Sequence, residues 1–430
     1  MRIDRIKVAN FKNFDQLDAS FAPGVNLFVG GNGSGKTSIL EAINVALGGF
    51  FGSQEQKMQR GIEFDEIKIT NGKREPFSSV TGFSDEINQE WTRNIKRDTR
   101  ANDIKGIKVA VDFGKQFFDN FDNADDRTIA PLIAFYSTQR LFKDSSQSHK
   151  QRYDAASARR NGYLQSLKEN AIKGTLNEWL GNAVTRRATK FINDIESDDL
   201  VLENVEQAIR QTLIFFMNLP EDFALKIYQD PDFGNEIYVN YDNEHNLPLS
   251  YYSDGFRNLI YLIFDLVWRA SQLNPWLKLT ELSANVNGVV TIDEIDLHLH
   301  PRWQAKAVAM LQKLFPKVQF FITTHSPTVV ANLEEGTLYE VNNKTVIKSE
   351  NDFFGKKINY ILRDVLDASD RHVQTQQKLD KLFVLIDNDV INEYEPLLLQ
   401  LKALLGDDDP DIIKAQALID WRNEDKQQLE

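Results

Sequence analysis

The strongest constraint on the fold is a glycine-rich run, Gly30-Gly31-Asn32-Gly33-Ser34-Gly35-Lys36-Thr37. The mainly apolar residues 25–29 before it are typical of a buried strand, and apolar residues at helical spacing continue after it up to residue 47. In such a strand-loop-helix unit, backbone N–H groups can surround phosphates, Lys36 supplies a cation, and the Thr37 hydroxyl can bind Mg²⁺. The run predicts an α/β fold whose nucleotide ligands are Gly30, Asn32, Gly33, Ser34, Gly35, Lys36, Thr37 and Ser38.

A second candidate site lies after the apolar residues 289–292, which end on the adjacent carboxylates Asp293 and Glu294. Paired acids after a strand can simply mark the end of that strand. A phosphate-binding loop upstream, however, requires an acidic partner. Asp293 is suited to hold the Mg²⁺ shell, and Glu294 is suited to polarise the water that attacks a γ-phosphate. We therefore favour a catalytic role for the pair.

Two further segments could contact a nucleotide. Ser253-Asp254-Gly255-Phe256-Arg257 precedes the apolar residues 259–268, so Ser253 is expected at a helix N-terminus, where anions bind; an ordinary N-cap is the alternative. His325 comes shortly after the expected strand 318–323 and is suited to hydrogen-bond the γ-phosphate or the attacking water. A zinc site at His298, His300 and His325 is less favoured, because the sequence supplies no supporting ligands.

Charge is unevenly distributed along the chain, whose formal net charge is -13. Residues 140–190 hold eleven Lys and Arg against four acids, whereas residues 381–430 hold twelve acids against five bases. The basic segment can bind nucleic acid, because clustered cations release counterions from a phosphate backbone. A solvated helical face explains the same charges equally well, so both interpretations stay open.

Neither a membrane span nor a secretory signal is expected. The longest apolar run, residues 259–268, is far shorter than the ~20 residues that span a bilayer, and it contains Asp265. The first residues of the chain lack an uninterrupted apolar core. The chain has no cysteine, which excludes disulfides and thiolate metal sites and fits a reducing cytoplasmic compartment.

Several blocks, in order along the chain, resemble those of the AAA15/AAA21-type ABC ATPases, which are relatives of RecF, SMC heads and OLD nucleases. The blocks are residues 10–14, 30–37, 253–257, 293–301 and 324–327, together with the segment around Gln139. The resemblance implies an ABC-type P-loop ATPase head that uses ATP and Mg²⁺, with a mainly helical insertion and a small helical C-terminal tail.

The same resemblance implies roles for individual residues. Gln139 corresponds to a Q-loop residue that helps to hold the metal, together with Thr37 and Asp293. Ser253 and Gly255 correspond to a signature segment that contacts ATP bound by a partner subunit. Asp296 corresponds to the D-loop. The implied catalytic residues are Lys36, Glu294 and His325.

The resemblance also divides the chain into four segments. We expect an N-terminal ATPase lobe at residues 1–138 and a mainly helical, basic insertion at residues 139–245. A C-terminal ATPase lobe with the signature, the acidic pair and His325 is expected at residues 246–350, and an acidic helical tail at residues 351–430. Residues 50–130 carry no pattern to which we can assign a role.

The C-terminal tail resembles that of one particular branch of these ATPases. Residues 381–387 and the acidic residues 406–410 are similar to the segment after the ATPase core in the PtuA-type ATPases of the Septu anti-phage system, which also accompany some retrons. This likeness implies a homo-oligomer built from ATP-sandwich dimers. It also implies that ATP controls a partner HNH nuclease, encoded nearby, that acts on DNA.

Three other classes are weighed against this one. A RecF/SMC-like DNA repair ATPase is the main alternative; the absence of a long coiled-coil pattern counts against an SMC protein but not against RecF. An OLD-type nuclease is less favoured, because Asp387-Asn388-Asp389 resembles its metal motif but has no acidic strand as partner. Transporter ATPases are disfavoured by the blocks at residues 10–14 and 253–257.

Overall fold

The computed structural model describes residues 1–55, 58–121, 127–138, 159–168, 173–193, 199–230, 236–240, 246–342, 344–366 and 371–429. The chain divides into two compact units, Met1–Ile358 and Asn359–Glu430. The boundary between the units therefore lies a few residues beyond position 351, where we expected the tail to begin.

The larger unit is built around a six-stranded sheet with the order β16-β15-β3-β14-β13-β9. Five of these strands run parallel, and β16 pairs antiparallel at the edge. Every residue of β3, β9, β13 and β14 is buried, as expected for parallel strands that are covered on both faces. The strands are β3 (Val25–Val29), β9 (Leu132–Tyr136), β13 (Gly288–Ile292), β14 (Val318–Thr323), β15 (Thr337–Asn342) and β16 (Thr345–Lys348).

The segment 50–130, to which we had assigned no role, contributes three strands to a second, antiparallel sheet. Its order is β2-β1-β6-β7-β8, and helix α1 (Lys36–Leu47) contacts strands of both sheets. Trp91 on β7 is buried and donates its indole N–H to the carbonyl of Ala46 on α1, at 2.9 Å. The strands are β1 (Arg5–Phe11), β2 (Phe14–Ser20), β6 (Phe77–Ser84), β7 (Gln89–Lys96) and β8 (Asn102–Asp103), and α2 (Lys108–Phe121) packs against β7.

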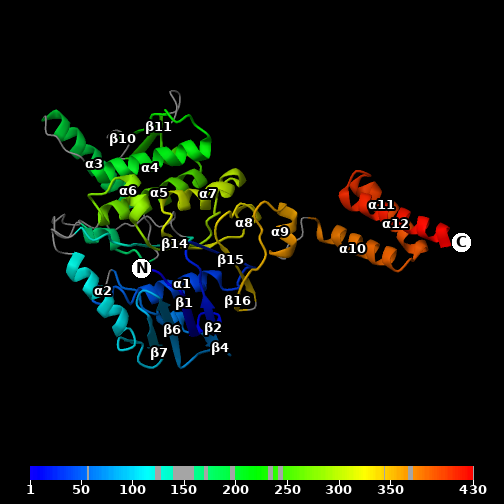
Figure 1. The fold of residues 1–430 in the computed structure, drawn as a ribbon, viewed down its shortest axis with the longest axis horizontal. Helices are drawn as coiled ribbons and strands as arrows, with labels where there is room; N and C mark the ends of the chain where they lie inside the picture. Colours follow the sequence, from blue (N-terminus) through cyan, green and yellow to red (C-terminus); the bar gives the residue numbers. More distant parts are fainter. Residues whose placement is uncertain are drawn as a thin grey trace. The chain divides into compact units, whose positions relative to one another are not determined.

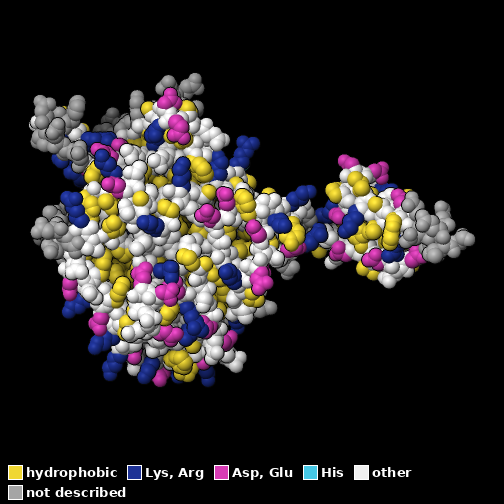
Figure 2. Space-filling model, in the orientation of Figure 1, with side chains coloured by type: hydrophobic (Ala, Val, Ile, Leu, Met, Phe, Trp, Pro, Cys, Tyr) yellow, Lys and Arg dark blue, Asp and Glu magenta, His cyan; other side chains and the backbone are white. Residues whose placement is uncertain are grey.

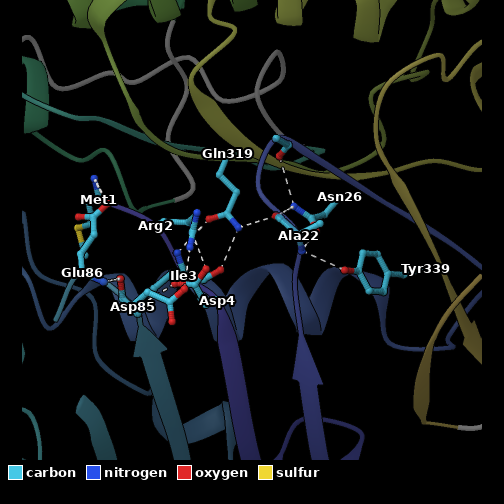
Figure 3. Close-up of polar contacts among 12 residues, drawn as sticks. Met1, Arg2, Ile3, Asp4, Ala22, Asn26, Asp85, Glu86, Gln319 and Tyr339 are labelled. Atoms are coloured by element: carbon cyan, nitrogen blue, oxygen red, sulfur yellow. Dashed lines mark hydrogen bonds and ion pairs between the residues drawn. The ribbon is translucent and has the colours of Figure 1, made fainter. Parts of the chain in front are cut away.

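A group of polar contacts ties the N-terminal segment to the central sheet (Figure 3). The buried Gln319 of β14 accepts from the backbone N–H of Ile3 and donates to the carbonyl oxygens of Ile3 and Ala22, each at 2.9 Å. Asn26 of β3 and Tyr339 of β15 also bond the backbone of Ala22. These contacts fix the two sheets, and therefore α1 between them, in one arrangement.

Helices cover the other side of the central sheet from α1 (Figure 1). Helix α5 packs on β9 and also against α4. The residue pattern of α5 is strongly apolar, and 17 of its 20 residues are buried, which explains why it lies at the centre of this layer. The helices are α3 (Lys173–Ile192), α4 (Leu200–Met217), α5 (Asp254–Leu273), α6 (Leu279–Asn285), α7 (Pro301–Leu314) and α8 (Pro327–Ala331).

The segment 139–245 differs in part from the mainly helical insertion that we expected. Helices α3 and α4 agree with the expectation, but β10 (Lys226–Asp230) and β11 (Glu236–Asn240) pair antiparallel, and β12 (Asn246–Pro248) extends the sheet. The difference has a local cause. Ile227 and Tyr238 are buried, and both strands contain β-branched and aromatic residues, which favour strands over helices.

The smaller unit is a helical bundle with its own apolar core. Buried Leu382, Leu401 and Ile412 come from three different helices of this core. Asp387 is the last residue of α10 and Asn388 is its C-cap, so the Asp387-Asn388-Asp389 run ends a helix. The helices are α9 (Ile358–Asp364), which begins at the boundary, α10 (Val373–Asp387), α11 (Ile391–Leu405) and α12 (Pro410–Leu429). Among the described residues, no helix is both long and apolar enough to span a membrane.

Candidate functional site

The glycine-rich run forms the expected loop between β3 and α1. Lys36, the first residue of α1, donates its ammonium to the carbonyl oxygens of Gly30 at 2.9 Å and Gly31 at 3.0 Å. At Gly30 (φ 150°) a Cβ atom would lie 2.3 Å from the carbonyl oxygen of Val341, and at Gly35 (φ 113°) it would lie 2.6 Å from the Phe14 ring. Only glycine fits these two positions, so the loop shape results directly from the sequence.

A cavity of about 330 Å³ lies over this loop and the N-terminus of α1. The free N–H groups and the dipole at a helix N-terminus favour an anion. The cavity collects most of the nucleotide-binding and catalytic residues that we expected, and it adds Lys12 and Asn13. Its lining residues are Lys12, Asn13, Asn32, Gly33, Gly35, Lys36, Thr37, Ser38, Asp293, Glu294 and His325.

The acidic pair reaches this cavity because β13 and β14 are neighbours in register, with Ile292 opposite Ile322. Asp293 accepts hydrogen bonds from the hydroxyls of Thr37 (2.9 Å) and Thr323 (2.6 Å). The Thr323 hydroxyl in turn accepts from the backbone N–H of Glu294 at 2.8 Å. One threonine therefore holds both acids in place.

Glu294 adopts a left-handed backbone conformation with φ 47°. This conformation costs a non-glycine residue roughly 1–2 kcal/mol and persists only where neighbouring contacts enforce it. Here the bonds from the backbone N–H of Asp293 to the carbonyl of Tyr136, and from Glu294 to Thr323, enforce it. Such locally strained turns concentrate at functional sites, which agrees with the role expected for Glu294.

The oxygen donors at this point suit Mg²⁺. Thr37 and Asp293 meet through a hydroxyl–carboxylate hydrogen bond of 2.9 Å, and hard oxygen ligands of this kind are those that Mg²⁺ prefers. The side chain of Asp293 is buried, so a cation there would compensate a charge that water does not reach. Gln139, the third expected metal contact, lies outside the described residues.

Two lysines place positive charge around the cavity. Burial lowers the pKa of Lys36, although Asp293, Glu294 and Asp296 act in the opposite direction. Lys12 forms an ion pair with the buried carboxylate of Glu41 on α1. Burial raises the pKa of Glu41, and the pair with Lys12 opposes that shift. Both lysines line the cavity, so positive charge lies beside the glycine-rich loop.

Ser253 and Gly255 lie elsewhere, and neither is among the described residues that line the cavity. The Ser253 hydroxyl accepts from the backbone N–H of Phe256 at 3.4 Å and caps the 20-residue helix α5. A Cβ atom at Gly255 would lie 2.1 Å from the carbonyl oxygen of His298, so α5 packs closely on the loop after Glu294. Ser253 itself is exposed.

The three histidines that could have suggested zinc occupy different environments. His325 lines the cavity, whereas His300 caps α7 and accepts from the backbone N–H of Arg302 at 3.3 Å. Among the described residues, no group of three or more His, Asp or Glu side chains is arranged to hold a metal ion by itself.

The basic segment is only partly described, and several of its cations have structural partners. Arg159 donates to the carbonyl oxygens of Leu273, Phe121 and Thr128. Arg187 pairs with Glu206 at 2.8 Å, and Arg186 lies 3.7 Å from Asp199. Arg159 is therefore half-buried and bonded to backbone carbonyls, so it belongs to the packed structure rather than to a solvated face. Arg186 and Arg187 remain half-exposed and compatible with either interpretation.

Sequence reasoning missed three residues that shape the site. Lys12 and Asn13 were seen only as part of the block at residues 10–14, and Asn13 donates to the carbonyl oxygen of Gly33 at 3.3 Å. Thr323 was seen only as the end of a strand. The sequence signal for Thr323 was a polar residue ending a buried strand beside the acidic pair, which marks the edge of a parallel sheet where ligands bind.

The chain is similar to proteins of known families. Residues 25–331 match the AAA_21 family, described as an AAA domain, putative AbiEii toxin, Type IV TA system. The chain is 24% identical over 392 residues to the retron Vc95 probable ATPase of Vibrio cholerae, covering 80% of this chain and 74% of that one. It is 25% identical over 332 residues to the Septu protein PtuA of Bacillus thuringiensis, covering 76% and 72%.

Among solved structures, the SMC head bound to the C-winged helix domain of ScpA is similar, with a TM-score of 0.45 and 14% identity. The similarity covers 81% of this chain and 98% of that one.

The arrangement predicts a measurable role for Thr323. The substitution Thr323→Val keeps the shape but removes the hydroxyl that holds both Asp293 and the backbone of Glu294. Losing a residue that orients a metal ligand typically lowers metal affinity or activity roughly 10- to 100-fold. We expect ATP turnover to fall by that factor and the Mg²⁺ concentration for half-maximal turnover to rise.

Thr81→Val provides the matched control, because Thr81 bonds Thr92 at 2.8 Å between β6 and β7, away from the cavity. It should leave turnover within about twofold of the unmodified protein, as distant surface changes usually do. Equal effects of the two substitutions would show that Thr323 has no special role.

Proposed function

Because the chain belongs to the AAA_21 family, we propose that it is the ATPase subunit of an anti-phage defence complex, in which ATP controls an HNH nuclease acting on DNA. One observation carries this proposal: the similarity to a retron ATPase and to Septu PtuA extends over more than 70% of both chains in each case. The ATP hydrolase activity belongs to the family; the coupling to a nuclease is the proposed part.

In the proposed hydrolysis, each of the main cavity residues has its own role. Lys36 and the N-terminus of α1 bind the phosphates, and bound Mg²⁺ would supply further positive charge at Thr37 and Asp293. Glu294 orients and polarises the attacking water, since its backbone is held by Thr323. His325, two residues after β14, donates a hydrogen bond to the γ-phosphate or to that water.

The site is completed by a second copy of the chain. Ser253 is exposed at the N-terminus of a long helix, and the cavity of the same chain is lined by other residues. An exposed helix N-terminus is suited to an anion that it does not reach within its own subunit. In the proposed dimer, ATP bound by one copy faces Ser253 and Gly255 of the other, so each ATP joins two subunits.

DNA contact in this complex has support from the charge on the larger unit. Exposed Lys and Arg side chains, with acidic side chains among them, lie along the edge of the larger unit near β4 (Ile69–Thr70) and β7 (Figure 2), and β5 (Lys73–Arg74) pairs with β4. Lys73, Lys96 and Arg100 are exposed there. Clustered exposed cations attract a phosphate backbone even on a chain whose net charge is -13.

The shared site predicts that Ser253→Arg separates binding from hydrolysis. The bulky cation would block the partner's nucleotide while leaving the cavity of its own chain unchanged. We expect ATP binding to a single subunit to be retained and turnover to fall on the order of 100-fold, as when a group that contacts the transition state is lost. Equilibrium binding and phosphate release measure the two quantities.

Thr280→Arg is the control for added bulk and charge, because Thr280 is exposed on α6 and has no proposed contact with nucleotide. Turnover should then stay within about twofold. Full turnover by Ser253→Arg would contradict the shared site.

Control of a nuclease predicts an association that depends on nucleotide state. Glu294→Gln should bind ATP without hydrolysing it and so hold the dimeric state. Affinity purification of this variant with the products of the neighbouring genes should recover an HNH protein. Its DNA cleavage should differ at least about tenfold between the variant and the unmodified chain, a coupling of ~1.4 kcal/mol.

Recovery of recombination or replication proteins instead, with no nuclease, would favour the RecF/SMC-like repair alternative. The same outcome would reject the defence function while leaving the ATPase chemistry intact.

A further inference from the structure

Helix α5 contains a buried acidic residue that the proposed hydrolysis does not use. Asp265 is 1% exposed and lies in the middle of the most apolar stretch of the chain. It accepts from the phenol of Tyr136 at 2.7 Å and from Nε of Arg269 at 2.7 Å. Tyr136 and Arg269 are buried as well, so a charged pair and a phenol are enclosed together between α5 and β9.

The cluster extends to a third segment. Arg269 donates to the carbonyl oxygens of Gly162 at 2.9 Å and Leu164 at 3.1 Å, in and just after the short helix η2 (Arg159–Tyr163). Burial and the neighbouring Asp265 raise the pKa of Tyr136 well above its usual range, so the phenol stays protonated and remains a donor.

Stability alone does not explain these residues. Replacing a buried ion pair by apolar side chains of similar volume is often neutral or stabilising, because the charges lose their hydration. Hydrogen bonds are directional, so those of Asp265 and Arg269 fix both the position of α5 along its axis and its rotation about that axis. The residues therefore point to a role in geometry.

Tyr136 is the last residue of β9, and its carbonyl oxygen accepts from the backbone N–H of Asp293 at 2.8 Å. The same residue thus bonds the acidic pair through its backbone and α5 through its side chain. Asp265 lies twelve residues after Ser253, a distance of roughly 18 Å along an α-helix.

A second attachment lies near the N-terminus of α5. Asn258 donates to the carbonyl oxygen of Leu297 at 3.1 Å, and Gly255 packs on His298. Both partners belong to the loop after Glu294. Helix α5 is therefore held at two points. Asp265 bonds Tyr136, whose backbone bonds Asp293, and the N-terminal turn contacts the loop after Glu294.

We propose that Tyr136, Asp265 and Arg269 are positioning residues, which set the placement of α5 so that Ser253 reaches the nucleotide of the partner subunit when Asp293 and Glu294 are arranged for hydrolysis. This inference rests on the proposed shared site. It assigns to the cluster a role in turnover rather than in nucleotide binding, since no member of the cluster lines the cavity in the described part of the chain.

Tyr136→Phe tests the inference, because it removes one hydroxyl and leaves the ring and the Asp265–Arg269 pair. We expect kcat to fall at least about fivefold while KM and the equilibrium affinity for ATP change less than about twofold, the pattern of a lost interaction that acts only during turnover. Asp265→Asn, which keeps the side-chain shape, should act in the same direction.

Tyr163→Phe is the matched control. Tyr163 is equally buried and its phenol donates to the carbonyl oxygen of Pro131 at 2.8 Å, but it does not bond Asp265. It should lower the melting temperature about as much as Tyr136→Phe and leave kcat unchanged. Equal kcat values for the two phenylalanine variants would overturn the positioning role.

A double-mutant comparison separates this inference from the shared site. If α5 acts through Ser253, Tyr136→Phe should cause no further loss in a Ser253→Arg background, because coupled residues are not additive. If the two losses multiply, the cluster acts independently of Ser253 and the inference fails. If Ser253→Arg alone has no effect, the shared site itself is rejected, whatever Tyr136→Phe does.

Discussion

The carboxylate of Asp293 makes the interaction on which the remaining site geometry depends. Thr37 at the start of α1 and Thr323 at the end of β14 both donate to it, so three separate segments meet at one buried side chain. Asp293 can occupy this position only because β13 lies between β9 and β14 in a parallel sheet. Its neighbour Glu294 has a left-handed backbone conformation and lines the same cavity.

The two layers around the central sheet serve different parts of this arrangement. On one side, α1 packs between two sheets, and the glycine-rich loop leads directly into its first residue. On the other side, α5 presents Ser253 at an exposed end and is bonded to Tyr136 near its middle. Both layers contact the strand ends that carry the acidic pair, so nucleotide binding and the proposed contact with a second copy share one rigid centre.

The sequence was most informative where the signal is local. The glycine run, the strand before it and the helix after it result from glycine conformation and apolar spacing within a few residues, and the structure confirms the α/β P-loop fold that they predict. The acidic pair and His325 were expected at strand ends, and the parallel sheet brings these residues into one cavity.

Long-range contacts explain the features that the sequence did not reveal. The pairing of β6 with β7 and β1 depends on residues up to about 80 positions apart, so the segment 50–130 showed no pattern of its own. Lys12 and Thr323 carry no distinctive local signal, and only the fold places them beside Lys36 and Asp293.

The proposed function depends on one ATP being shared by two copies of the chain, and complementation between inactive variants is the sharpest test of that sharing. Lys36→Ala removes the phosphate-binding lysine and Ser253→Arg blocks the opposite half, so each variant alone should hydrolyse ATP very slowly. In an equimolar mixture, mixed dimers would combine an intact cavity from one variant with an intact Ser253 from the other. We expect the mixture to regain a substantial part of the turnover of the unmodified protein. If the mixture is no more active than its components although mixed dimers form, the ATP site is contained within a single chain.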